Sequence, residues 1–114
     1  MVTPTRTWSS AILQTPIPIS FSASGDNIIV AAVSGKIIRL YRLLLVVGAA
    51  TSITFFDGTP GGTALSGAFP FSAGGSMVLD DSGDAWYMTS PGNALVLNNL
   101  NAVQVSGTAW YIQQ

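Results

Sequence analysis

The sequence predicts an all-β fold, an antiparallel β-sandwich of jelly-roll type with eight or more strands. Three observations lead to this prediction. Glycine or proline interrupts the chain at short intervals, so few stretches are long enough to be helices. The segments between these residues are rich in β-branched and aromatic side chains, which pack well on a pleated surface. Several segments alternate apolar and polar residues with a period of two, which is typical of a strand with one buried face.

The expected strands follow one another between the turns, and the clearest are those that alternate. Residues 51–57 begin with Ile53 and Phe55 on one face, and residues 102–112 place Val103 and Val105 on one face. Because successive side chains of a strand point to opposite faces, each segment is expected to bury one side. The full set of expected strands is 8–14, 17–22, 27–33, 36–47, 51–57, 64–70, 76–80, 85–89, 93–98 and 102–112.

Residues 36–47 form the longest expected strand, which is apolar on both faces. Its cations recur every third residue, a spacing that would also suit an amphipathic helix. Gly35 and Gly48 bracket the segment, and its β-branched residues favour a strand. The core of a small sandwich covers one face of a strand, so we expect another subunit to cover the other face. The residues expected at this interface are Ile37, Arg39, Tyr41, Leu43 and Leu45.

Charge is scarce, and this favours association between copies. Charged residues make up 8% of the chain, against about 25% in typical soluble domains. The cluster of Lys36, Arg39 and Arg42 is too small for a nucleic-acid surface, which draws on many phosphate contacts. Two interpretations of this cluster stay open. Its cations pair with aspartates or lie exposed at strand ends, or they contact a neighbouring protein, where arginine is enriched.

Catalytic groups are also scarce. The chain has neither cysteine nor histidine, which excludes disulfides, thiolate zinc sites and Ser-His-Asp or Cys-His arrangements. Its glycine pairs lack the lysine and the following serine or threonine of a phosphate-binding loop. We therefore expect a protein that is not an enzyme and that uses no cofactor.

Two further groups of residues allow a binding interpretation beside a structural one. Residues 80–84 alternate aspartate and serine oxygens as in calcium loops, but the same residues are favoured in a polar turn. Trp8, Trp86 and Trp110 could form an aromatic platform for sugars, or they could serve packing in the core and between subunits. In both cases the structural interpretation is the expected one, and a bound ion or glycan stays open.

The N-terminal residues are expected to form an extended arm. We place the arm at residues 1–16 and the sandwich domain at 17–114. Arg6 and Trp8 are the candidate anchors of the arm on a neighbouring protein, because these residue types dominate interface energetics. No apolar run reaches the about 20 residues of a membrane span, and the first residues do not resemble a signal peptide. Synthesis and assembly in a cytoplasm are therefore expected.

Five stretches carry a resemblance to a known group of proteins. They are residues 31–40 (AAVSGKIIRL), 54–59 (TFFDGT), 65–67 (LSG), 86–98 (WYMTSPGNALVLN) and 105–112 (VSGTAWYI). In this order they resemble small β-sandwich proteins encoded among the virion genes of tailed bacteriophages, which are regarded as capsid decoration (cement) or related accessory proteins.

The resemblance implies a virion structural protein. It would bind the major capsid protein as a homotrimer, reinforce the capsid lattice and be located in the virion. The alternative is a receptor- or carbohydrate-binding module of a phage tail or head fibre. A third interpretation is a non-viral lectin with a sandwich fold.

Overall fold

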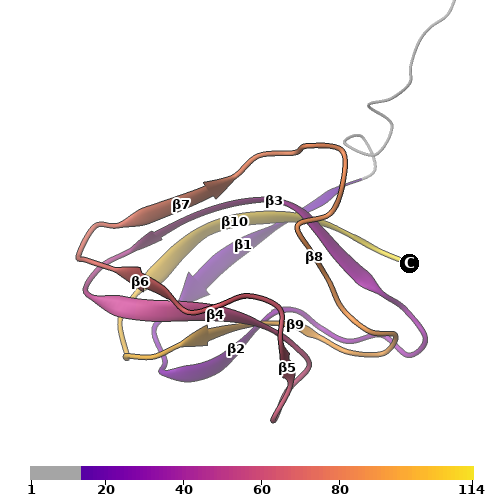
Figure 1. Cartoon of the computed structure of the whole chain (residues 1–114), viewed down its shortest axis with the longest axis horizontal. Helices are drawn as coiled ribbons and strands as arrows, with labels where there is room; N and C mark the ends of the chain where they lie inside the picture. The colour runs from indigo at the N-terminus through magenta and orange to yellow at the C-terminus, as the bar shows by residue number, and fades with distance from the viewer. Residues whose placement is uncertain (1–13) are drawn as a thin grey trace, which may run out of the picture.

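Residues 14–114 are described by the computed structural model, and their strands form two antiparallel sheets that pack face to face (Figure 1). Sheet A contains, in spatial order, β1 (Thr15–Phe21), β10 (Val105–Gln113), β3 (Ile38–Val47) and β7 (Ser76–Leu79), and β8 (Tyr87–Met88) also pairs with β3. Sheet B contains β2 (Gly25–Val30), β9 (Leu95–Asn99), β4 (Thr51–Asp57) and β5 (Thr63–Ala64), and β6 (Phe69–Phe71) also pairs with β4.

The strand order confirms the predicted antiparallel sandwich of jelly-roll type. The chain alternates between the sheets, because β1 and β3 belong to sheet A while β2 and β4 belong to sheet B. The last two strands return to the middle of the sheets. β9 lies between β2 and β4, and β10 lies between β1 and β3. Such long-range crossovers are the mark of double Greek-key sandwiches.

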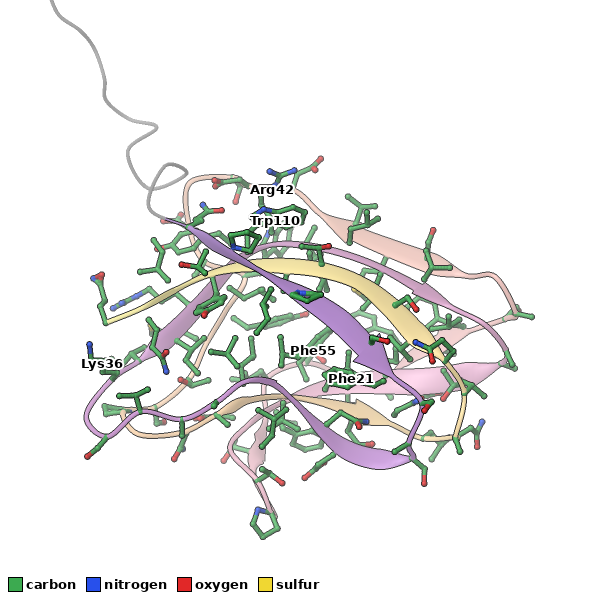
Figure 2. All side chains as sticks on the ribbon, turned by 180° about the vertical axis from the view of Figure 1, so that it is seen from behind. Phe21, Lys36, Arg42, Phe55 and Trp110 are labelled. Carbon is green, nitrogen blue, oxygen red and sulfur yellow. The ribbon has the colours of Figure 1, made fainter. Side chains whose placement is uncertain are left out.

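The core lies between the sheets and is built from alternate residues of the long strands. On β3 the inward side chains are fully buried, and on β4 Ile53 and Phe55 are buried as the sequence predicts. The Phe55 ring stacks on Tyr87 at a centroid distance of 5.1 Å and meets Phe69 edge-on at 6.4 Å. Figure 2 shows Phe55 between the two layers, where it joins sheet B to β8 of sheet A.

A β-bulge in β3 changes which of its residues face the core. Trp110 of β10 pairs with Arg42, and the next residue, Tyr111, pairs with Leu40, so Tyr41 has no partner in the ladder. An extra residue of this kind interrupts the alternation of a strand. Before the bulge the buried residues of β3 have even numbers, and after it they have odd numbers.

Several element boundaries differ from the predicted ones. β3 begins at Ile38 because residues 33–36 form a turn, closed by a hydrogen bond from Lys36 N to Val33 O of 3.0 Å. The predicted strand 64–70 is divided into β5 and β6. β1 begins at Thr15, inside the segment expected as an arm. Residues 1–13, with Arg6, Trp8 and most of the predicted strand 8–14, lie outside the described residues.

Two aspartates tie loops to the ends of sheet B. The Asp57 carboxylate accepts hydrogen bonds from the backbone N–H of Ser90 at 3.0 and 3.1 Å, from the Ser90 hydroxyl at 2.8 Å and from Asn93 Nδ2 at 3.0 Å. The Asp26 carboxylate accepts from Thr59 Oγ1 at 2.6 Å and from Asn98 Nδ2 at 2.8 Å. An ionised carboxylate accepts all of these hydrogen bonds. A protonated carboxyl group would lose some of them, because one of its oxygens then carries a hydrogen.

The two carboxylates predict a loss of stability in acid. Burial raises the pKa of Asp57, but the hydrogen bonds from Ser90 and Asn93 outweigh it and hold the pKa below the ordinary 3.8. Hydrogen bonds from Thr59 and then Asn98 likewise lower the pKa of Asp26, against a smaller effect of burial. The unfolded chain therefore binds more protons than the folded chain near pH 4, so stability falls as the pH falls through this range.

We expect the free energy of unfolding to drop by about 1 kcal/mol between pH 5 and pH 3, because both carboxylates lie near the surface where water screens them. Urea unfolding at a series of pH values measures this drop. Asp57→Asn should lower stability at pH 5 and flatten the dependence on pH. A profile that is equally steep in the variant and the parent would show that Asp57 contributes nothing.

Candidate self-association surface

Exposed apolar side chains gather on the outer face of sheet A. Leu44, Val46 and Val78 are 44%, 43% and 59% exposed, and we call these three residues the outer patch. Leu44 lies directly beside Val78 in the register of β3 and β7. Val46 is two residues from Leu44 on the same strand and therefore shares its face. The inward neighbours of the patch belong to the core, so the patch covers the outside of a rigid sheet.

Uncharged residues continue this face across β10 and β1. Thr108 of β10 pairs with Leu44, and Ser106 pairs with Val46. On the far side of β10, Pro18 of β1 pairs with Thr108. The side chains of Leu44, Val46, Val78, Ser106, Thr108 and Pro18 thus form a continuous uncharged area across the four strands.

A cation lies at one end of this face, where it is covered by an aromatic ring. The Arg42 guanidinium carbon is 4.4 Å from the centroid of the Trp110 ring, which is a cation–π contact. Figure 2 shows the two side chains together on the outside of sheet A. Arg42 and Trp110 are partners in the β3–β10 register, so the bulge that turns Arg42 outward also makes this contact.

The five residues of β3 and its flank that the sequence places at an interface differ in how far they are buried. Leu43 and Leu45 are 1% and 0% exposed and belong to the core of their own subunit. Ile37 and Arg39 are half-buried, and Arg39 pairs with Met88 of β8. Tyr41 is the half-buried residue of the bulge. The exposed residues of β3 after the bulge are instead Leu44 and Val46.

Sequence reasoning missed the outer patch for a specific reason. Residues 43–47 are an unbroken apolar run, so no polar residue marks which alternate set faces the core. The nearest polar residue is Arg42, which faces outward. Because of the bulge at Tyr41, the even-numbered residues before it face the core, whereas those after it face outward. Val78 of β7 lies in the apolar run of residues 77–79, and its neighbour across the ladder is set by tertiary register.

The acidic segment is a polar loop that bends at residues 83 and 84 and is held by hydrogen bonds of Asp81. Asp81 Oδ1 accepts from the N–H of Gly83 at 2.9 Å, and Asp81 Oδ2 accepts from Gln14 Nε2 at 2.8 Å. The nearby Trp86 donates its indole N–H to the carbonyl of Asp80 at 2.7 Å. Within residues 14–114, no group of three His, Cys, Asp or Glu side chains could hold a metal ion.

The described part of the chain offers no enclosed site for a small molecule. No pocket opens between residues 14 and 114. These residues also contain no helix that is long and apolar enough to cross a membrane.

Comparison with known proteins supports the fold. No protein-family model matches the sequence. No curated protein matches it either. A solved chain from Bacillus endospore appendages, which are described as a novel family of disulfide-linked pili, superimposes with a TM-score of 0.53 and 18% sequence identity. The superposition covers 88% of this chain and 84% of the appendage chain.

This match corrects the resemblance to bacteriophage decoration proteins. The matched chain comes from a bacterial pilus and not from a phage capsid. The phage assignment was wrong because its motifs are short glycine and asparagine turns between apolar strands, which recur in unrelated sandwiches. The capsid-reinforcing function and its alternative of a phage fibre module are withdrawn with it. So are the major capsid protein as partner and the virion, assembled in a host cytoplasm, as location.

Proposed function

We propose that this chain is a non-enzymatic structural subunit that associates with copies of itself into a fibre. The observation that carries the self-association is the outer patch of Leu44, Val46 and Val78, an exposed apolar surface on sheet A. Exposed apolar side chains that lie next to one another indicate an interaction surface, whereas single exposed apolar residues are common on any protein. The shared fold with a chain that forms appendages on Bacillus endospores supports the same role, in an extracellular fibre.

The charge of the chain also favours self-association. Four cationic and five acidic side chains leave a formal net charge of −1 on 114 residues. Copies of the chain therefore repel one another weakly, and a net charge near zero promotes association.

The proposed fibre differs from the matched pili in how its subunits are joined. Those pili are described as disulfide-linked, whereas this sequence contains no cysteine. Apolar contact and hydrogen bonds between neutral groups must then hold the subunits together. Residues 1–16 remain our candidate for an extension onto a neighbouring subunit, with Arg6 and Trp8 as anchors, although residues 1–13 lie outside the described part.

Self-association can produce either a closed ring of subunits or an open fibre. A contact between two different surfaces of neighbouring copies repeats without limit unless rotation closes it into a ring. The homotrimer expected from the sequence would be such a closed form, and an open fibre would be the unclosed form. Electron microscopy of the purified chain separates the two.

Filaments should form from the purified chain at concentrations of about 10 to 100 µM, a range in which moderate protein affinities are satisfied. They should form equally with and without a reducing agent, because no thiol takes part. Negative-stain images with parallel light scattering measure this. A chain that stays monomeric over the whole range, at low and high salt, would refute the proposed function.

A further inference from the structure

We propose that two copies of this chain pack through the outer faces of their A sheets, around a two-fold axis that passes close to Leu44 and Val78. The inference deepens the proposed function and rests on its premise of self-association. Each copy would lay its outer patch on the outer patch of the other. This contact would join subunits of two fibres that lie side by side. The contact between successive subunits along one fibre would use another surface.

Proline blocks two of the sheet edges, whereas the edge strands β2 and β7 contain none and β7 has only four residues. β1 is an outer strand of sheet A, and it carries Pro16 and Pro18 at alternate positions. β6, which pairs on the outer side of β4, carries Pro70. Proline has no N–H to donate, and prolines on edge strands block the addition of another strand. The face of sheet A is apolar and has no such block.

The charge distribution is compatible with a second copy as the partner. A two-fold contact brings each group near its own equivalent, so a charged patch would meet the same charge on the other copy. The outer patch and its neighbours Thr108, Ser106 and Pro18 are all neutral. Within residues 14–114, Arg42 lies at the end of the face over the Trp110 ring, and the exposed Asp80 follows β7 two residues after Val78. A strongly charged partner would find no opposite charge on the outer patch.

The size of the face sets the strength expected of one contact. β3 has 10 residues, which span about 33 Å, and four strands at about 4.8 Å spacing are about 19 Å wide, so the face measures at most about 600 Å². Stable interfaces bury about 800 Å² on each partner. A single pair is therefore expected to dissociate readily, while a row of such contacts along two fibres adds up through multivalency.

The absence of cysteine allows a direct test in the full-length chain. We would prepare Leu44→Cys and Val78→Cys, each with a single thiol, and oxidise them or treat them with a short thiol-to-thiol cross-linker. A single thiol can join two copies only when equivalent residues approach each other, since disulfides need Cβ atoms about 4 Å apart. Thr63→Cys, on the exposed β5 of sheet B, is the matched control.

We expect a covalent dimer from Leu44→Cys or Val78→Cys with at least a tenfold higher yield than from Thr63→Cys. In the Leu44→Cys background, Val78→Lys should reduce the yield by about tenfold, while the uncharged Val78→Thr should leave most of it. Val78 is 59% exposed, so neither change should prevent folding. Circular dichroism checks that each variant keeps its strands.

The outcomes separate this inference from the proposed function. Filaments without cross-linking above the Thr63→Cys control would overturn the face-to-face contact and leave the fibre subunit intact. Cross-linked dimers without filaments would support the contact and overturn the fibre. An unchanged yield in the Val78→Lys background would also overturn the contact, because two lysines cannot be buried at its centre without loss.

Discussion

Replacing Gly107 with alanine is expected to destabilise the protein by about 4 kcal/mol or to prevent its soluble expression. A Cβ atom at this position would overlap the carbonyl oxygen of Leu44 and lie 2.8 Å from the Cα atom of Leu45, both in β3. These are backbone atoms, which cannot rotate away as a side chain would. β10 cannot retreat either, because β1 pairs with its other side.

Urea unfolding followed by tryptophan fluorescence measures this loss. Gly67→Ala is the matched control, since a Cβ there meets no atom within 4 Å, and its effect should stay within about 0.5 kcal/mol. If Gly107→Ala unfolds at the same urea concentration as the parent, β3 and β10 are not held as closely as described.

Replacing Phe55 with alanine is expected to cost about 4 kcal/mol of unfolding free energy. The Phe55 side chain is 0% exposed and contacts the rings of both Tyr87 and Phe69. Its removal leaves a cavity between the sheets and deprives β8 of the ring against which Tyr87 stacks. Phe55→Leu, which keeps most of the volume, should cost clearly less.

The neighbouring Phe56 provides the control for this experiment. Phe56 lies on the opposite face of β4 and is only half-buried, so Phe56→Ala should cost less than half as much as Phe55→Ala. Thermal and urea unfolding of the three variants measure the order. Equal losses at the two positions would mean that the core is not centred between the sheets at Phe55.

The sequence predicted most of the fold, because the fold depends on local patterns. Residues 51–57 form β4 with the predicted bounds, since apolar and polar residues alternate as far as Phe55 and the turn residue Gly58 follows. Turn residues separated the strands correctly for the most part. What local patterns could not supply is the pairing: nothing within residues 105–113 indicates that they lie between β1 and β3.

The sequence predicted that residues 36–47 carry apolar side chains on both strand faces, but it did not predict which of them face outward. An apolar excess on residues 36–47 correctly indicated a strand with apolar side chains on both faces. The choice between Leu43 and Leu44 as the outward residue depends on the bulge at Tyr41, which arises from the register with β10. A family resemblance based on turn motifs could not correct this, because such motifs reflect the geometry of sandwiches in general.

The central positions of β9 and β10 have a consequence for the moment at which a newly made chain becomes competent to assemble. Until the ribosome has produced residues 95–113, β1 has no neighbour in sheet A and β2 has none in sheet B. Strand pairings between residues so distant in the sequence form slowly, because the intervening loop must close first. The continuous face from β1 to β7 therefore forms only after residues 105–113 have been made, so shorter nascent chains do not present it.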